Sequence, residues 1–274
     1  MKNNIDVKND SMIAFTGGQI LTMDSEQKYV ETVVIKESHI VDVGDRSLLK
    51  AYPDAEIHDL KGRVLLPSFI DSHNHLSSFG CFFPTWVNLI GLTEKESVME
   101  KIQLQARKKP GKGWIIGFGW FDTKIGGFDL TKNDLDEISS DRPVLLIQAT
   151  FHQSVVNSQA LELVGITRST PEPRCGIILR ESNGMPTGVL VEYAQVPVFR
   201  LVMEADTGTL ANLIEARAKE LLKFGITAVH DPGVTPAAEA AYQKLHDEER
   251  LPVSVLMMPH GETVLDNQLG YRLH

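Results

Sequence analysis

The sequence predicts an α/β protein in which a small β-rich segment precedes a parallel sheet with covering helices. Three observations lead to this prediction. Residues 12–66 carry short β-branched runs separated by tight turns, residues 64–71 form a nearly continuous apolar run, and helical and extended patterns alternate from residue 209 onward. Such alternation is typical of βα units, whose strands lie side by side in a parallel sheet.

The β-rich segment is predicted to form a small antiparallel sheet. Its extended runs are short, and turn residues such as Gly17-Gly18 and the polar pair Glu37-Ser38 separate them. The run that follows, from Val64 to Asp71, is apolar on both faces. We therefore expect residues 64–71 to form one strand that is fully buried in a parallel sheet.

The middle of the chain is predicted to contain helices and strands that lead to a hairpin. The Asn183-Gly184 pair lies between two extended runs and is a strong signal for a hairpin turn. The expected elements are a helix over 93–108, a strand over 113–120, a helix over 130–138, a strand over 143–150, a helix over 158–164 and hairpin strands over 176–180 and 188–191.

The last part of the chain predicts two successive βα units. A helix over 210–224 has apolar residues at helical spacing, and Gly225 follows it as a C-terminal cap. The elements expected after this helix are a strand over 226–231, a helix over 236–249 and a strand over 252–258.

Composition excludes several classes of partner. The 274 residues, 42% of them hydrophobic, can bury a sizeable core. A formal net charge of -9 argues against nucleic acid as a partner, because phosphate neutralisation needs clustered Lys and Arg. No stretch approaches the roughly 20 apolar residues that a membrane crossing needs. Two distant cysteines and a polar start without an apolar leader favour the cytoplasm.

The clearest chemical feature is the pair His73 and His75 at the end of the apolar run. Residues two apart on a strand point to the same side, so both imidazoles project together. Two imidazoles at the C-terminal end of a buried parallel strand form half of a metal site, and imidazole suits zinc and similar divalent ions. Asp71 would support the strand end. The alternative is a surface strand whose two histidines bind nothing.

Residues 65–76, Leu-Leu-Pro-Ser-Phe-Ile-Asp-Ser-His-Asn-His-Leu, resemble the strand-1 signature of the amidohydrolase superfamily. Further motifs narrow the resemblance to the YtcJ-like branch, often called the amidohydrolase 3 family, from about residue 12 to the C-terminus. These motifs lie at residues 113–120, 129–136, 141–144, 152–158, 186–192 and 225–231.

The resemblance implies an incomplete metal-dependent-hydrolase (β/α)8 barrel beside part of a β-sandwich. Mapped onto this sequence, it implies a β-sandwich portion at 1–63, barrel strand 1 at 64–76, an α/β insertion at 77–185 and a truncated continuation of the barrel at 186–274. About three barrel strands can be counted where eight are required, and three strands cannot close a barrel.

The resemblance also implies site residues. His73 and His75 would bind a divalent metal, with zinc favoured, and Glu192 would replace the carboxylated lysine that bridges two metals in many relatives. Glu192 could instead be an ordinary glutamate at a helix start. His152 would line the substrate pocket or cap the following helix, and Trp120 is a weaker pocket candidate that could simply be packed.

Further candidates carry weaker signals. Asp122 lies in the same glycine-rich turn as Trp120, and His230 ends the second expected barrel strand, where it could bind metal or hydrogen-bond a ligand. His260 and His274 do not lie where a family ligand is expected. The Gly-x-Gly pair within residues 117–119 lacks the third glycine of a dinucleotide motif, which argues against nucleotide binding there.

The implied reaction is metal-assisted hydrolysis of a carbon–nitrogen bond in a small, non-peptide amide-type substrate. The aspartate that takes the proton in relatives lies on a later strand, so no catalytic residue is assigned in this sequence. We therefore expect this chain alone to be inactive, and to associate with a missing C-terminal half or with itself. The alternative is a non-catalytic fragment or a degenerate stand-alone domain.

Overall fold

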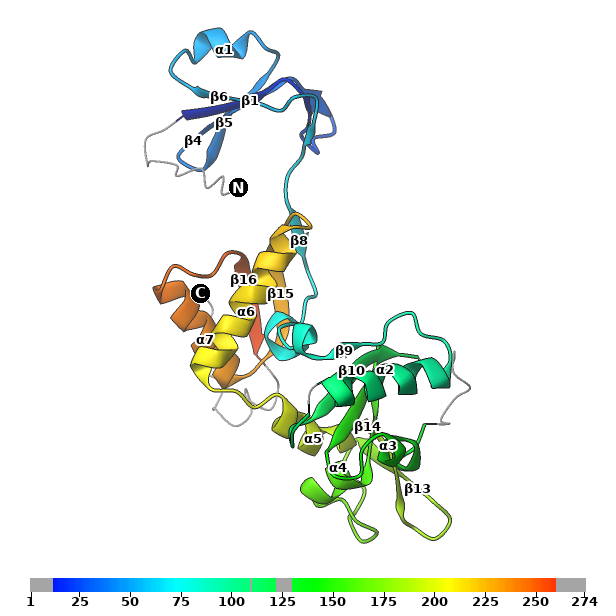
Figure 1. Ribbon diagram of the computed structural model, residues 1–274. Helices are drawn as coiled ribbons and strands as arrows, with labels where there is room; N and C mark the ends of the chain where they lie inside the picture. The colour runs from blue at the N-terminus through cyan, green and yellow to red at the C-terminus, as the bar shows by residue number, and fades with distance from the viewer. Residues whose placement is uncertain (1–11, 109, 122–129, 260–274) are drawn as a thin grey trace. The chain divides into compact units, whose positions relative to one another are not determined.

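The computed structural model describes residues 12–108, 110–121 and 130–259. The chain divides into an N-terminal unit, residues 1–69, and a C-terminal unit, residues 70–274 (Figure 1). Among the described residues, no helix combines the length and the apolar character that crossing a membrane demands. The candidates Asp122, His260 and His274 lie outside the described residues.

The N-terminal unit consists of two small sheets with one short helix. Its elements are β1 (Met12–Thr16), β2 (Gln19–Leu21), β3 (Tyr29–Val30), β4 (Thr32–Lys36), β5 (His39–Gly44), α1 (Leu48–Ala51), β6 (Glu56–Asp59) and β7 (Val64–Leu65). The strand orders are β5-β4-β1-β6 and β3-β2-β7.

The prediction of a small antiparallel sheet in this unit is confirmed for three strand pairs and wrong for two, because the unit has two sheets and both are mixed. Strand β1 pairs with β4 antiparallel and with β6 parallel, and β2 pairs with β3 antiparallel and with β7 parallel. Parallel strands need a crossover connection. The segment that carries α1, between β5 and β6, allows β6 to run in the same direction as β1.

The C-terminal unit contains two sheets and most of the helices. Its strands are β8 (Phe69–Asp71, which begins at the boundary), β9 (Val87–Asn88), β10 (Ile115–Trp120), β11 (Val144–Gln148), β12 (Gln153–Val156), β13 (Gly176–Arg180), β14 (Pro186–Glu192), β15 (Ile226–Val234) and β16 (Ser254–Pro259). Its α-helices are α2 (Lys95–Lys108), α3 (Lys132–Ile138), α4 (Ser158–Leu163), α5 (Val196–Val202), α6 (Thr207–Leu222) and α7 (Pro236–Asp247). These bounds confirm the helices and strands expected between residues 93 and 258 to within a few residues.

The larger sheet has the strand order β13-β14-β12-β11-β10-β9, and helices cover both of its faces. Side chains of β11 alternate between two hydrophobic clusters, as the pleat of a strand requires. Val144 and Leu146 pack with residues of α2 and α3, whereas Leu145 and Ile147 pack with residues of α4 and α5. Strand β14 belongs to this sheet, so the sheet extends past residue 185.

The glycines of the Gly-x-Gly pair in β10 have a packing role. A Cβ on Gly117 would lie 2.5 Å from Cδ1 of Ile102, a residue of α2. Gly119 has a φ of +103°, in a region that other residues rarely adopt, and a Cβ there would lie 2.4 Å from Ile90. The pair therefore lets α2 and the segment after β9 approach β10 closely.

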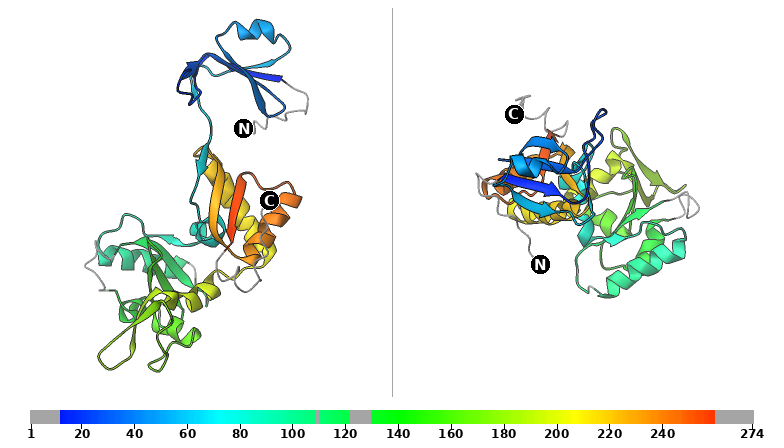
Figure 2. Two further views of the ribbon diagram at one scale, coloured as in Figure 1. Left: turned by 180° about the vertical axis from the view of Figure 1, so that it is seen from behind. Right: turned by 90° about the horizontal axis from the view of Figure 1, so that it is seen from above.

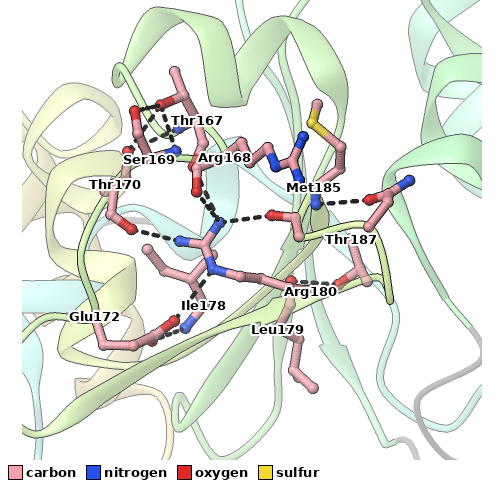
Figure 3. Close-up of polar contacts among 12 residues, drawn as sticks. Thr167, Arg168, Ser169, Thr170, Glu172, Ile178, Leu179, Arg180, Met185 and Thr187 are labelled. Atoms are coloured by element: carbon pink, nitrogen blue, oxygen red, sulfur yellow. Dashed lines mark hydrogen bonds and ion pairs between the residues drawn. The ribbon is translucent and has the colours of Figure 1, made fainter.

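An arginine organises the hairpin end of this sheet (Figure 3). The guanidinium of Arg180 donates hydrogen bonds to the backbone carbonyls of Thr167, Arg168, Thr170 and Gly184, at 2.6–3.4 Å, and reaches the Glu172 carboxylate. This one side chain thus ties the loop after α4 to the β13–β14 hairpin, whose turn contains the predicted Asn-Gly pair.

The smaller sheet has the order β16-β15-β8, and β15 pairs with β16 in parallel. Helices α6 and α7 cover one of its faces. The left view of Figure 2 shows the sheet from its other side, with β15 and β16 in front of α6. Several apolar side chains of this sheet are exposed: Phe69 by 54%, Ile70 by 65%, Leu256 by 54% and Met257 by 42%. The three strands form no closed barrel in the described part of the chain.

The single buried strand predicted over residues 64–71 is wrong. The run forms two short strands, β7 and β8, which belong to different sheets, and Val64 is 52% exposed. Pro67, in the gap between them, has no N–H for a sheet ladder. Strand β8 is an edge strand in a three-stranded sheet, so it lacks the neighbours that burial on both faces requires.

Candidate metal centre

The predicted histidine pair follows the end of β8 in a turn that Asp71 organises. The Asp71 carboxylate accepts hydrogen bonds from the backbone N–H of His73, at 3.3 Å, and from the side-chain amide of Asn74, at 2.8 Å. The structure thus confirms that Asp71 supports the strand end.

The two imidazoles lie next to each other and are exposed. The ring centroids of His73 and His75 are 5.0 Å apart, and the ring planes are nearly perpendicular. Nδ1 of His75 lies 3.1 Å from the backbone carbonyl oxygen of Pro232. A carbonyl can only accept, so this contact favours the neutral tautomer in which Nδ1 carries the proton and Nε2 keeps the lone pair that a metal needs.

The structure brings together two residues that the sequence analysis singles out separately, His152 and Glu192. Nδ1 of His152 lies 2.8 Å from Oε1 of Glu192, and the Glu192 N–H donates to the His152 carbonyl at 2.9 Å. Both side chains are exposed, by 70% and 49%. His152 does not cap the following helix, because Asn157 is the N-cap residue of α4.

The backbone of Glu192 is unusual. Its φ of 51° lies in the left-handed region, where a residue with a Cβ carries strain, and such strain is concentrated at functional sites. Glu192 ends β14 and precedes the short 3-10 helix Tyr193–Gln195, but its carboxylate makes no capping hydrogen bond to that helix. The carboxylate contacts His152.

The two pairs do not form one cluster. Within the described ranges, no group of three or more His, Cys, Asp or Glu side chains is arranged to hold a metal ion. The His73–His75 pair fits two ligands of a divalent site, and the structure leaves Glu192 paired with His152. Trp120 is fully buried in the cluster between α2, α3 and the six-stranded sheet. His230 accepts the Asn74 N–H through its backbone carbonyl.

Sequence reasoning missed two buried residues behind the histidine pair, Asp231 and Tyr242. The Tyr242 hydroxyl donates to Oδ2 of Asp231 at 2.6 Å, and the Ser77 N–H donates to the same oxygen at 3.0 Å. A sequence signal did exist: Asp231 stands two residues after Val229 on β15, at a position where strand alternation would place an apolar side chain.

Comparison with solved structures identifies the class of protein. A structure titled as an uncharacterized metal-dependent hydrolase from Pyrococcus furiosus aligns over 93% of this chain and 51% of its own, with 30% identity and a TM-score of 0.65. A second one, from Pyrococcus horikoshii OT3, covers 94% of this chain and 50% of its own, with 27% identity and a TM-score of 0.68.

Sequence comparison identifies the family. The model of the amidohydrolase family matches residues 56–271, and the chain belongs to this family. The YtcJ protein of Bacillus subtilis (strain 168) is 33% identical over 257 residues, which cover 90% of this chain and 48% of that protein. N-substituted formamide deformylase of Arthrobacter pascens is 31% identical over 252 residues, or 89% and 46%. The chain therefore spans about half the length of these relatives.

Proposed function

We propose that the chain contributes the first metal ligands of a hydrolase that cleaves carbon–nitrogen bonds in small amide-type molecules. The observation that carries the proposal is the geometry of His75, whose Nδ1 faces a backbone carbonyl so that Nε2 is free beside His73. Family membership supports the reaction class. The name of the Arthrobacter pascens relative supports N-substituted formamides as the first substrates to test.

His73 and His75 would hold a divalent metal, and Glu192 would be a third ligand. An imidazole pair with a carboxylate favours zinc among the common divalent ions. Bound metal would supply Lewis acidity for a substrate carbonyl and a lowered pKa for a bound water. In this chain, the contact with the Pro232 carbonyl would hold the tautomer of His75, and the contact with His152 would orient the Glu192 carboxylate. His152 would line the substrate pocket, and Trp120, which is fully buried, is the weaker pocket candidate.

The three-stranded sheet is proposed to be part of an incomplete (β/α)8 barrel. Its exposed apolar residues, such as Ile70 and Leu256, support this proposal, because a group of apolar side chains on a solvent-exposed surface marks an interface. The chain spans about half of its relatives, which supports the further proposal that hydrolysis requires additional strands, from a C-terminal half or a second copy. Two free cysteines, Cys81 and Cys175, support a cytoplasmic location.

Metal binding tests the proposed site directly. Calorimetric titration of the 274-residue chain with Zn²⁺ is expected to show binding that His73→Ala and His75→Ala each weaken by more than the 10–100-fold typical of an outer hydrogen-bond partner. Glu192→Gln is expected to have a smaller effect. His39→Ala is the matched control, because His39 is an exposed histidine on β5 of the N-terminal unit.

Formate release from N-substituted formamides tests the reaction. Turnover is expected when the chain is supplied with the C-terminal half of a relative, and none is expected from the chain alone. Equal Zn²⁺ affinity in the wild type and both histidine variants would contradict the proposed site. Turnover by the isolated chain would contradict the requirement for further strands.

A further inference from the structure

A buried carboxylate lies on β15, next to the residue whose backbone carbonyl contacts His75. Asp231 is fully buried on the face of β15 that α6 and α7 cover. Its Oδ2 accepts the Tyr242 hydroxyl of α7 and the backbone N–H of Ser77. Its Oδ1 has no hydrogen-bond partner among the described residues.

This arrangement is costly for folding. A buried carboxylate that lacks a cationic partner costs several kcal/mol of desolvation, and two hydrogen bonds repay only part of it. Among the described residues, Asp231 takes part in no ion pair. Burial raises the pKa of the Tyr242 hydroxyl well above its usual range, and Asp231 adds to this effect. Tyr242 therefore stays protonated and remains a donor.

Asp231 belongs to a row of contacts that attach residues 74–78 to β15. In that row, the Asn74 N–H donates to the His230 carbonyl at 2.9 Å, Nδ1 of His75 faces the Pro232 carbonyl, and the Ser78 hydroxyl donates to the Gly233 carbonyl at 3.4 Å. These three contacts use carbonyls of β15. The Ser77 contact uses the Asp231 side chain, so it depends on which residue occupies position 231.

We propose that Asp231 and Tyr242 are positioning residues that hold the His75 ring against the Pro232 carbonyl and so present its Nε2 to a metal. The inference rests on the metal site proposed above. The pair connects α7 to the segment that follows the histidines, and Ser77 is two residues from His75. Loss of the pair weakens the Ser77 contact and loosens this segment against β15, so that the His75 ring can turn and exchange its proton between both nitrogens.

The first test needs no metal. In the 274-residue chain labelled with ¹⁵N-histidine, long-range proton–nitrogen spectra report which ring nitrogen of His75 carries the proton. The wild type is expected to show the Nδ1–H tautomer, and Tyr242→Phe and Asp231→Asn are expected to show a tautomer mixture. Tyr52→Phe is the matched control, because the Tyr52 hydroxyl donates to the Asp42 carboxylate at 3.1 Å in the N-terminal unit.

The second test measures affinity for Co²⁺, whose absorption bands report ligand geometry. Tyr242→Phe and Asp231→Asn are expected to weaken Co²⁺ binding by about 10–100-fold and to alter the bands, as loss of an outer partner of a metal ligand does. Tyr52→Phe is expected to change neither. If Asp231→Asn does not fold, Tyr242→Phe, which removes one hydroxyl and keeps the ring, carries the test.

The two tests separate the inference from the proposed function. An unchanged His75 tautomer in both variants would overturn the positioning role, whether or not the chain binds a metal. A tautomer mixture in the variants, together with no Co²⁺ binding by the wild type, would support the positioning role and contradict the metal site. Unchanged Co²⁺ affinity in variants of a wild type that binds would also overturn the inference.

Discussion

The two sheets of the C-terminal unit are built from similar residues but differ in how completely they are covered. In the six-stranded sheet, all five residues of β11 are buried, because helices pack on both faces. In the three-stranded sheet, Leu256 and Met257 of β16 are equally apolar but are exposed. Burial in this protein therefore depends on neighbouring elements and not on the hydrophobicity of a strand.

The same difference divides the proposed site. His152 and Glu192 lie next to the fully covered sheet, where they contact each other. His73 and His75 follow β8, at the edge of the partly covered sheet, and they depend on hydrogen bonds to β15 for their geometry. We expect the geometry of the first pair to be rigid. The geometry of the second pair should be sensitive to substitutions in β15 and in the residues that pack on it.

The largest expected effect is a difference in stability between two Leu→Ala variants. Leu146→Ala, in the middle of the covered sheet, should lower the free energy of unfolding by about 2–5 kcal/mol through lost packing and a cavity. Leu256→Ala, at a residue that is 54% exposed, should change it by no more than about 0.5 kcal/mol. Urea unfolding followed by tryptophan fluorescence measures both, and equal losses would refute the comparison.

A smaller effect is expected on association. If the exposed face of the three-stranded sheet is an interface, burying Ile70 there contributes about 1.5–3 kcal/mol. Ile70→Lys should then weaken self-association, measured by sedimentation velocity over a range of concentrations, by about tenfold or more. Ile40→Lys is the control, since Ile40 is 67% exposed on β5 of the N-terminal unit and Ile70 is 65% exposed. Identical behaviour of the two variants would show that Ile70 has no special role.

The smallest effect concerns cysteine reactivity. Burial raises the pKa of the Cys81 thiol to about 12, and the Asp231 charge adds to the rise, so little reactive thiolate exists at pH 8. Cys175 is exposed. A disulfide reagent at pH 8 should therefore modify Cys175 rapidly and Cys81 only when the region around β15 opens. In a Cys175→Ser chain, fast modification of Cys81 would show that this region is open most of the time.

Much of the local structure could be predicted, because it depends on residues close in sequence. The capping box of α3, formed by Thr131 and Asp134, and the turn at Asn183-Gly184 depend on side chains within a few residues. The prediction of one buried strand over residues 64–71 is wrong because burial there depends on residues far away in the sequence. Its apolar character indicated burial, but only the strand order shows that β7 joins β2 and that β8 is an edge.

For the site, the sequence by itself determined that His73 and His75 lie together after a strand and that the chain belongs to the amidohydrolase family. The tertiary structure decided that Glu192 pairs with His152 across 40 residues, and that the carbonyl of Pro232 orients His75 across 157 residues. It also decided that Asp231 is buried. Spacing along a strand is set by the covalent chain, whereas partners this far apart meet only through the packing of whole elements.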